Sequence, residues 1–290
     1  MAERKGIILA GGSGTRLYPI TLAVSKQLMP IYDKPMIYYP LSVLMLAGIR
    51  KIAIITTPHD QSQFQKLLGD GRNWGLELTY LVQPSPDGLA QAYLIAEQFL
   101  DGAPSAMVLG DNIFFGHGLP ELLQKADTGD HAATVFGYHV ADPERYGVIE
   151  ITDTGQVKSI VEKPARPKSN YAMTGLYFLD QYAPQYARMV EPSKRGELEI
   201  TDLLKLYHQE NALNVEVMGR GFAWLDTGTH ASLLDAANFV RTLQTRQGMQ
   251  TGCPEEIAFN KGWISEKDVH AIADKLGQNA YAAYLRQLVS

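Results

Sequence analysis

Short runs of apolar residues, rich in β-branched side chains, recur through the first half of the chain. They span residues 6–10, 52–57, 78–82, 106–109 and 132–138. Such runs are typical of strands that are buried on both faces of a sheet. Segments with apolar residues at helical spacing separate them, at residues 36–47, 61–68, 89–99 and 119–125. This alternation predicts a mostly parallel sheet with helices on both faces.

The pattern changes after about residue 140. Strand-like segments then lie at residues 147–151, 157–161, 172–178 and 215–218. Turn signals such as Asp153-Thr154-Gly155 separate them, so we expect antiparallel or mixed strands that extend the same α/β fold. A long helix is predicted at 229–245, with a cap within Asp226-Thr227-Gly228-Thr229. From Glu255 onward the chain predicts two or three small helices, which form a C-terminal appendage.

No internal repeat, low-complexity tract or linker divides the chain. We therefore expect a single α/β domain over residues 1–246 and a helical segment over residues 247–290. A chain of 290 residues can bury a large core without covalent staples. The single cysteine, Cys253, allows no intramolecular disulfide and fits a reducing compartment.

Charge and hydropathy narrow the classes of partner. The formal net charge is −5 and no basic stripe is present, which argues against a nucleic-acid surface. The apolar run at residues 6–10 is too short for a signal peptide or a membrane span. We therefore expect a cytoplasmic protein that binds no nucleic acid and no membrane, with any phosphate binding confined to a local site.

The first apolar run leads directly into Gly11-Gly12-Ser13-Gly14-Thr15-Arg16. A glycine-rich turn at the carboxyl end of a parallel strand presents backbone N–H groups to a phosphate. The segment is not a P-loop, because no Gly-Lys-Ser/Thr follows it. It is not a dinucleotide motif either, since Leu17 stands where that motif needs a small residue. The alternative is an ordinary tight turn between strand and helix.

Two cations follow in a stretch that prolines interrupt. Pro19, Pro30 and Pro35 predict an extended loop that can bring Arg16 and Lys26 over the same site. Fixed positive charges of this kind neutralise a triphosphate and its pyrophosphate leaving group. Alternatively, each cation is a solvated surface charge.

Two aspartates follow predicted strands, Asp111 after residues 106–109 and Asp226 after Ala223-Trp224-Leu225. Two carboxylates at one edge of a sheet form a site for a hard cation, and Mg²⁺ prefers few carboxylates together with phosphate oxygens. Asp226 could instead cap the helix that follows it. None of the seven histidines has the spacing of a zinc motif.

Long stretches of the chain resemble the sugar nucleotidyltransferases, and most closely the glucose-1-phosphate thymidylyltransferases. The string GIILAGGSGTRLYPITLAVSKQLMPIYDKPMIYYPL is similar to their N-terminal signature. Six later strings agree in order and spacing: QPSPDGLAQA, VLGDNIFFG, DPERYGVIEI, VEKPARPKSNYAMTGLYF, RGELEITDLL and GRGFAWLDTGTH. The resemblance implies a Rossmann-like nucleotide-diphospho-sugar transferase fold, with a nucleotide-binding part at about residues 1–140 and a sugar-binding part at about 141–228.

The resemblance also implies the roles of individual residues. The catalytic residues would be Arg16, Lys26, Asp111, Lys163 and Asp226, with Mg²⁺ bound by Asp111 and Asp226. The nucleotide would contact Gly11, Gly12, Gly14, Thr15, Arg16, Lys26, Gln27, Gln83 and Gly88, with Gln83 and Gly88 reading thymine. The sugar phosphate would contact Asn112, Gly147, Glu162, Lys163, Thr174, Gly175 and Trp224. Without the resemblance, Glu162 and Lys163 would be interpreted as a surface pair and Trp224 as a core aromatic.

The implied reaction joins dTTP and α-D-glucose 1-phosphate to give dTDP-glucose and pyrophosphate. A uridylyltransferase that uses UTP is one alternative, because uracil shows the same hydrogen-bonding edge as thymine. A nucleotide-sugar sensor without catalysis is another. Members of the family are typically homotetramers with a second site for the inhibitor dTDP-rhamnose. Here that regulatory site would comprise Phe115, Gly116, Gly219, Arg220 and Glu256.

Overall fold

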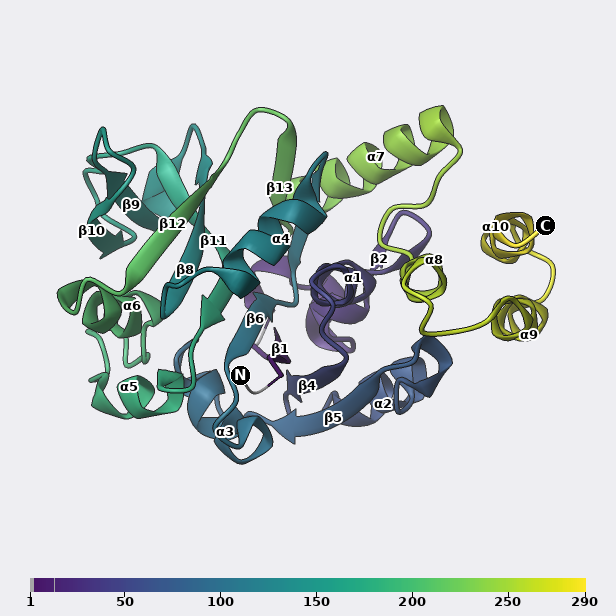
Figure 1. The fold of residues 1–290 in the computed structure, drawn as a ribbon, viewed down its shortest axis with the longest axis horizontal. Coiled ribbons are helices and arrows are strands. Elements are labelled where there is room, and N and C mark those ends of the chain that lie inside the picture. The colour runs from purple at the N-terminus through teal and green to yellow at the C-terminus, as the bar shows by residue number, and fades with distance from the viewer. Residues whose placement is uncertain (1–2, 13) are drawn as a thin grey trace.

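A computed structural model describes residues 3–12 and 14–290 (Figure 1). Ser13 of the glycine-rich segment therefore lies outside the described residues. The strands are β1 (Lys5–Ala10), β2 (Pro30–Ile31), β3 (Lys34–Pro35), β4 (Lys51–Thr56), β5 (Glu77–Val82), β6 (Ser105–Leu109), β7 (Asn112–Gly116), β8 (Ala133–His139), β9 (Gly147–Ile151), β10 (Val157–Glu162), β11 (Tyr171–Leu179), β12 (Leu213–Met218) and β13 (Phe222–Asp226).

The helices lie between and after these strands. They are α1 (Tyr38–Leu46), α2 (Gln61–Leu68), α3 (Gln91–Leu100), α4 (Leu119–Thr128), α5 (Ala183–Met189), α6 (Ile200–Gln209), α7 (His230–Gln247), α8 (Pro254–Asn260), α9 (Glu266–Leu276) and α10 (Ala280–Leu288). The short 3₁₀ helices are η1 (Thr15–Leu17), η2 (Ile20–Leu22), η3 (Lys26–Leu28), η4 (Arg72–Trp74) and η5 (Pro143–Arg145).

The central sheet is mixed and has the order β10-β9-β11-β6-β1-β4-β5, with β8 paired to β11 and β12 paired to β8. Strands β6, β1, β4 and β5 run parallel to one another. Strand β11 runs antiparallel to β6, β8 and β9, and β10 runs antiparallel to β9. The first half of the chain therefore forms the four adjacent parallel strands, and the second half adds most of the antiparallel strands together with β12, which runs parallel to β8. This confirms the α/β class with a mixed sheet.

Alternate residues of the buried strands face two separate cores, as strand geometry requires. Ile8 belongs to the core under α1, α2 and α4, whereas Ile7 belongs to the core under α3, α5 and α6. Figure 1 shows the sheet passing between these two groups of helices. Because the parallel strands are covered on both faces, their sequences are continuous apolar runs.

A separate two-stranded antiparallel sheet lies beside the central one. It pairs β7 with β13, and its register sets Asn112 opposite Asp226. Next to this pair, the Thr227 N–H donates to the Asp111 carbonyl oxygen at 3.2 Å. Asp111 and Asp226, which are far apart in the sequence, are thereby brought to neighbouring positions.

The long helix predicted at 229–245 is α7, and its N-cap is Thr229. The Thr229 hydroxyl accepts from the Ser232 N–H, and the Ser232 hydroxyl accepts from the Thr229 N–H, which completes a capping box. Asp226 is therefore not the cap of this helix. The cap lies within the predicted segment, and the Asp226 carboxylate remains available for another role.

The C-terminal helices α8, α9 and α10 lie beyond α1, away from the sheet (Figure 1). Helix α8 contacts α1 and η4, while Cys253, Val269, Ala273, Ala282 and Leu285 form a small core of their own. In the described part of the chain, no helix is long and apolar enough to cross a membrane. The cytoplasmic location stays a prediction.

The loop after the glycine-rich segment is more ordered than its prolines predict. It contains η1, η2 and η3, followed by the β2–β3 hairpin. Met36 N–H donates to the Met29 carbonyl and Ile37 N–H donates to the Gln27 carbonyl, both at 2.9 Å. These bonds fix the position of the Lys26–Gln27 turn relative to the start of α1.

Candidate active site

A cavity of about 600 Å³ opens at the carboxyl edge of the parallel strands. Ligands bind at this edge in open α/β sheets, because the loops that follow parallel strands converge there. Among the residues singled out from the sequence, the cavity is lined by Gly11, Gly12, Gly14, Thr15, Arg16, Lys26, Gln27, Gln83, Gly88, Asp111, Asn112, Gly147, Glu162, Lys163, Gly175, Trp224 and Asp226. Residues from both halves of the chain thus meet at one site.

The glycine-rich segment and Gln83 fit closely together. Gln83 follows β5 and is buried, and its N–H donates to the Thr56 carbonyl at 2.8 Å. Its Oε1 atom occupies the space that a Cβ atom at position 11 would need, so Gly11 allows the amide to approach the main chain. Gly14 has a φ of 60°, and its carbonyl accepts a 2.7 Å hydrogen bond from the Thr21 hydroxyl. The Gly14–Arg16 turn is therefore held over the edge of the sheet.

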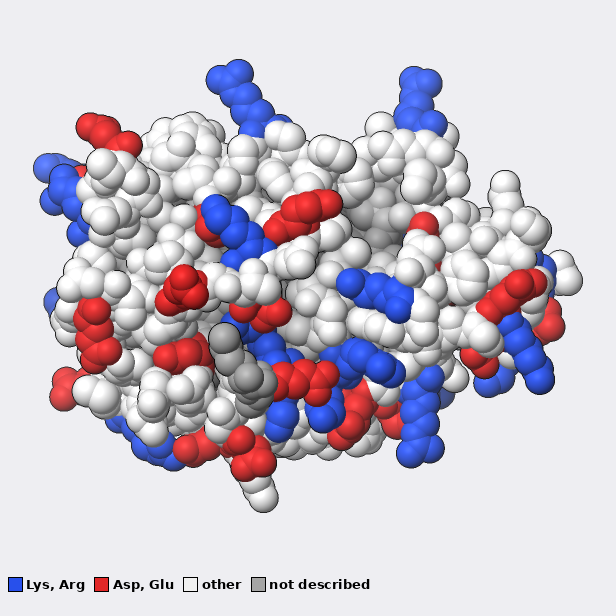
Figure 2. Space-filling model, in the orientation of Figure 1, with Lys and Arg blue, Asp and Glu red and all other residues white. Residues whose placement is uncertain are grey.

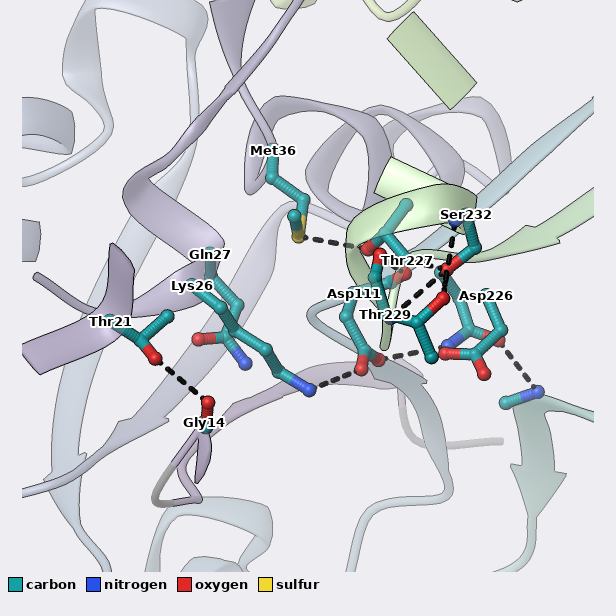
Figure 3. A network of polar contacts seen from close by, with 12 residues as sticks. Gly14, Thr21, Lys26, Gln27, Met36, Asp111, Asp226, Thr227, Thr229 and Ser232 are labelled. Atoms are coloured by element: carbon teal, nitrogen blue, oxygen red, sulfur yellow. Dashed lines mark hydrogen bonds and ion pairs between the residues drawn. The ribbon is translucent and has the colours of Figure 1, made fainter. Parts of the chain in front are cut away.

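A cation and two carboxylates gather at the centre of the cavity (Figure 3). The Lys26 ammonium donates to Asp111 Oδ2 in a close ion pair, and Asn112 Nδ2 donates to Asp111 Oδ1 at 2.9 Å. Burial pushes the pKa of Asp111 upward, but Lys26 and these hydrogen bonds outweigh it and hold the pKa below 3.8. Asp111 is therefore ionised at neutral pH.

Asp226 has the opposite balance. Burial and the neighbouring Asp111 charge raise its pKa above the ordinary value, although Arg16, Lys26 and Arg145 oppose the shift. Its nearest cation is Arg145, with Nη2 3.8 Å from Asp226 Oδ2. Two adjacent carboxylates in a largely buried place thus repel each other even with three cations nearby, and a bound metal ion would relieve that repulsion.

The donor set here suits a hard divalent cation that also binds phosphate. The described residues contain no group of three or more His, Cys, Asp or Glu side chains that could enclose a metal on its own. Two carboxylate groups with open positions match the preference of Mg²⁺ for few protein ligands plus substrate oxygens. The residues present therefore fit such a cation.

The far side of the cavity is lined by polar groups from the second half of the chain. Asn112 Oδ1 accepts from Trp224 Nε1 at 2.6 Å and from the Gly175 N–H at 3.1 Å. Glu162 ends β10, and the Lys163 ammonium lies 3.4 Å from its carboxylate. Lys163 has a φ of 40°, a left-handed conformation that is costly for a lysine.

Trp224 was interpreted either as a core aromatic or as a residue that contacts the sugar phosphate, and its position is compatible with both interpretations. The indole is buried and packs against Tyr146, with ring centroids 5.0 Å apart, yet it also lines the cavity. Thr174, in contrast, is not among the lining residues. It is fully buried, and its hydroxyl has no hydrogen-bond partner among the described residues. Met173 and Gly175 line the cavity on either side of it, because successive strand residues point to opposite faces.

Among the further lining residues that the sequence interpretation did not single out are Arg145, Tyr146, Arg195 and Glu199. Glu199 is buried and binds Arg195 through both carboxylate oxygens, at 2.8 and 2.9 Å. Arg195 also lies 3.6 Å from Glu162. The strings DPERYGVIEI and RGELEITDLL contain all four, so the signal was present in the sequence.

Three of the predicted regulatory residues, Phe115, Gly116 and Glu256, line a second cavity of about 410 Å³ between β7, α1, α4 and α8. Gly219 and Arg220 are not among its lining residues. They lie in the turn between β12 and β13. The structure thus brings three of the five together and leaves two apart.

Acidic and basic side chains are interspersed over the face of the molecule shown in Figure 2. On this face the two signs alternate over short distances, and neither forms a broad field. Within the described chain, the charges of Lys26, Asp111 and Asp226 are instead concentrated inside the first cavity.

Sequence comparison places the chain among known proteins. A sequence model of the family described as nucleotidyl transferase matches residues 5–242. A glucose-1-phosphate thymidylyltransferase of Xanthomonas campestris pv. campestris (strain B100) is 63% identical over 99% of this chain and 98% of its own length. Proteins of the same name from Neisseria gonorrhoeae and Mycobacterium tuberculosis (strain CDC 1551 / Oshkosh) are 57% and 52% identical, each over 98% of this chain and 99% of the relative.

Solved structures agree. A Bacillus anthracis chain, provisionally named a glucose-1-phosphate thymidylyltransferase and solved with sucrose, has a TM-score of 0.76 and 40% identity, covering 82% of this chain and 95% of that one. A UDP-glucose pyrophosphorylase with UDP-glucose has a TM-score of 0.72 and 27% identity, covering 83% and 100%. By its sequence, its sheet and the position of its cavity, this chain belongs to the nucleotidyl transferase family and, within it, to the glucose-1-phosphate thymidylyltransferases.

Proposed function

We propose that this chain transfers a thymidylyl group from dTTP to α-D-glucose 1-phosphate, giving dTDP-glucose and pyrophosphate. One arrangement carries the proposal. In the strand order of the sheet, β5 with Gln83 and β10 with Glu162 lie at opposite sides, and β6 with Asp111 lies between them. A single cavity is lined by all three side chains. A base, a phosphate chain and a sugar can therefore be bound in that order.

At the base end, the Gln83 amide offers a donor and an acceptor that match the edge of thymine. The glycines at positions 11 and 88 and the buried Gln27 complete this part of the pocket. Uracil offers the same edge. Discrimination through the 5-methyl group of thymine rests on apolar packing and contributes about 1–3 kcal/mol.

The triphosphate would lie along the glycine-rich segment. The main chain at Gly12, Gly14 and Thr15 borders the cavity, and the Arg16 and Lys26 side chains reach into it. Positively charged groups that are fixed before the reaction stabilise the charge that develops on departing pyrophosphate.

We infer that Asp111 and Asp226 hold Mg²⁺, which when bound neutralises charge on phosphate oxygens. Lys26 donates to one of these carboxylates, so it both orients Asp111 and lies beside the triphosphate. The repulsion between these two neighbouring carboxylates supports this assignment.

A phosphate oxygen of glucose 1-phosphate attacks the α-phosphorus of dTTP. A new P–O bond forms there, the bridging bond to the β-phosphorus breaks, and pyrophosphate leaves with the electron pair. The nucleophile is already anionic at neutral pH, so it needs no general base. The bond between the anomeric carbon and its oxygen stays intact. We assign the positioning of the acceptor phosphate to Lys163, with Arg195 beside it.

The sugar hydroxyls would contact Glu162, Asn112 and the main chain at Gly147 and Gly175, with Trp224 as the apolar wall. Thr174 contributes by packing rather than by contact, since its side chain faces away from the cavity lining. In this proposal residues at about 1–140 bind the nucleotide and residues at about 141–228 bind the sugar.

We propose that the second cavity is a regulatory site for dTDP-rhamnose in a homotetramer, as the family resemblance implies. Phe115 and Glu256 support the proposal because they give that cavity an aromatic wall and a carboxylate. Sedimentation analysis together with inhibition by dTDP-rhamnose tests it. Competitive inhibition that persists after Glu256→Ala would contradict a separate site.

Pyrophosphate release tests the main proposal, with dTTP, UTP, dCTP, dATP and dGTP each paired with several sugar 1-phosphates. We expect the highest kcat/KM for dTTP with glucose 1-phosphate in the presence of Mg²⁺. A higher kcat/KM for UTP would favour a uridylyltransferase. This is the second candidate function, because a UDP-glucose pyrophosphorylase has a similar fold. Binding without pyrophosphate release from any pair would favour a sensor.

A further inference from the structure

The amide of Gln83 can be placed in its pocket in two ways. Rotation by a half turn exchanges its acceptor Oε1 with its donor Nε2. Thymine and uracil present a donor at ring position 3 and an acceptor at position 4, whereas cytosine presents the reverse. The orientation of this amide therefore decides which class of pyrimidine can bind, and some other group has to fix it.

A chain of two hydrogen bonds runs from Gln83 away from the cavity. Gln83 Nε2 donates to Gln91 Oε1 at 2.7 Å, and Gln91 Nε2 donates to Asp87 Oδ2 at 3.0 Å. An ionised carboxylate can only accept hydrogen bonds, so Gln91 has to turn its NH₂ group toward Asp87. Its carbonyl then faces Gln83, and the NH₂ group of Gln83 has to face that carbonyl. The polarity of the whole chain is set at Asp87.

The turn that carries Asp87 is itself tightly held. The Asp87 carbonyl accepts a 2.6 Å bond from the Leu198 N–H, and the Ala90 N–H donates to the Leu198 carbonyl at 3.0 Å. Between them Gly88 has a φ of 109°, and a Cβ atom there would overlap the Leu198 main chain. Gln91 is the first residue of α3. The carboxylate and the relay amide thus both stand on rigid backbone.

This orientation leaves the acceptor of Gln83 beside Gly11, where both residues line the cavity. Its Oε1 lies against Gly11 at the cavity, and no donor among the described residues bonds to it. The second hydrogen of Nε2 points to the Gly88 carbonyl at 3.5 Å, which is too long for a strong bond. The amide therefore offers an acceptor and a nearly free donor to the ligand.

We propose that Asp87 and Gln91 are specificity-determining positioning residues: they lock the Gln83 amide so that the pocket accepts pyrimidines with an N–H at ring position 3 and rejects those with an acceptor there. Neither residue lines the cavity, so both act through Gln83. The inference rests on the proposed function, in that it assumes Gln83 contacts the base of a nucleoside triphosphate.

Calorimetric titration with dTTP, dCTP and UTP tests this inference without turnover, so failure of the proposed reaction leaves the test in place. The wild-type protein should bind dTTP more tightly than dCTP. In Asp87→Asn the new amide can donate as well as accept, so the relay can reverse. The factor by which dTTP binds more tightly than dCTP should then fall by about tenfold or more. The ratio of the Kd values for dTTP and UTP should stay unchanged.

The matched variant Asp87→Asn with Gln91→Glu restores the polarity. The carboxylate introduced at position 91 accepts both from the new amide at position 87 and from Gln83, so the dTTP preference should return even though two side chains have changed. Comparing ratios removes any effect of the lost charge at position 87, which acts on all triphosphates alike. The inference is overturned if Asp87→Asn weakens dTTP and dCTP equally, or if the double variant discriminates no better than the single one.

Discussion

Two lysines in the loop after the glycine-rich segment show how differently one residue type can be used. The Lys26 side chain lines the first cavity and is paired with Asp111. The Lys34 side chain is enclosed, with 2% of its surface exposed, and lines neither cavity. Lys34 is buried and Lys26 is partly buried, but only Lys26 lies next to space that a ligand can fill. A buried charge therefore indicates a site only when it faces an open volume.

The surroundings of Lys34 are satisfied within the described chain. Its ammonium donates to Asp33 at 2.7 Å and to Gln250 at 2.9 Å, and the rings of Tyr39 and Tyr281 lie within 5.7 Å. Burial lowers the pKa of Lys34, and the Asp33 charge opposes that shift. Around Lys26, in contrast, burial and the charge of Asp111 raise the pKa of Asp226, so the carboxylates there are not fully compensated. We interpret the Lys34 region as a structural joint between the β2–β3 hairpin and α8–α10.

The largest expected effect is at the two carboxylates. Asp111→Asn or Asp226→Asn should reduce kcat by about a thousandfold or more, because the hard-cation site loses a charged ligand. The thermal unfolding midpoint should change little, since neither side chain holds the core. Single-turnover kinetics at saturating Mg²⁺ measure the first quantity and calorimetry measures the second. Near-normal turnover in either variant would contradict the metal assignment.

The lysine pair is the sharpest test of the comparison. Lys26→Met should lower kcat by about a hundredfold to a thousandfold, because a fixed charge beside the triphosphate is lost. Lys34→Met should instead cost about 2–3 kcal/mol of unfolding free energy, because Asp33 and Gln250 lose their buried partner. Urea denaturation and pyrophosphate release should be measured on both. The proposed difference between the two lysines is contradicted if Lys26→Met and Lys34→Met change kcat and the unfolding free energy in the same way.

A third lysine, Lys163, is half-exposed. Its substitution should therefore affect substrate binding more than stability. Lys163→Ala should raise KM for glucose 1-phosphate by about tenfold while KM for dTTP changes far less, because the charge lies on the sugar side of the cavity. Initial rates with each substrate varied in turn give both constants. An equal rise in the two constants would assign Lys163 to the shared phosphate chain instead.

Tyr281→Phe tests the joint at α8–α10, because it removes only the hydroxyl group of Tyr281. Its hydroxyl donates to Glu255 at 2.5 Å, and Trp74 Nε1 donates to the same carboxylate at 3.0 Å. Removing one donor from a buried carboxylate should cost about 1–2 kcal/mol in unfolding free energy. The kcat of the folded protein should stay unchanged, as measured alongside Tyr281→Leu, which should be less stable still. A fall in kcat with unchanged stability would place the joint in the catalytic machinery.

The smallest effect concerns an exposed carboxylate. Asp268 accepts from the Ser265 N–H at 2.8 Å in the capping box of α9, and these hydrogen bonds lower its pKa below 3.8. A carboxylate whose pKa is lower in the folded state than in the unfolded state stabilises the fold at pH values above the ordinary pKa. This stabilisation is lost as the pH falls through the folded-state pKa. The unfolding free energies of wild type and Asp268→Ala should therefore approach each other as pH falls from about 5 to about 2. A constant difference over this range would exclude the carboxylate charge as the cause.

Much of the cavity was predictable because its residues follow strands. Gly11, Gln83 and Asp111 each come directly after an apolar run, and parallel strands bring such positions to one edge. The mixed sheet, the family and the long helix at α7 were predicted and are confirmed. The roles of the individual side chains in catalysis stay predictions.

Other features depend on contacts that no local pattern contains. Lys34, Gln250 and Tyr281 meet across more than two hundred residues of sequence, so Lys34 resembles any other loop lysine until the fold is known. Arg195 is a local i,i+4 partner of Glu199, and only its 3.6 Å contact with Glu162 joins segments that are distant in the sequence. Thr174 differs: strand alternation could have shown that it and Gly175 point to opposite faces.

The pairing of β7 with β13 has a consequence for how this protein can vary. Because Asn112 stands opposite Asp226, main-chain hydrogen bonds set the spacing of the two carboxylates. A one-residue slip would turn Asp226 to the other face of the ribbon. Insertions are therefore tolerable in the connecting turns, such as the one around Gly219, whereas a deletion inside either strand removes the site while leaving every one of its residues in the sequence. We therefore expect the turns that connect β7 and β13 to the rest of the chain to accept insertions, whereas the two strands have to keep their length.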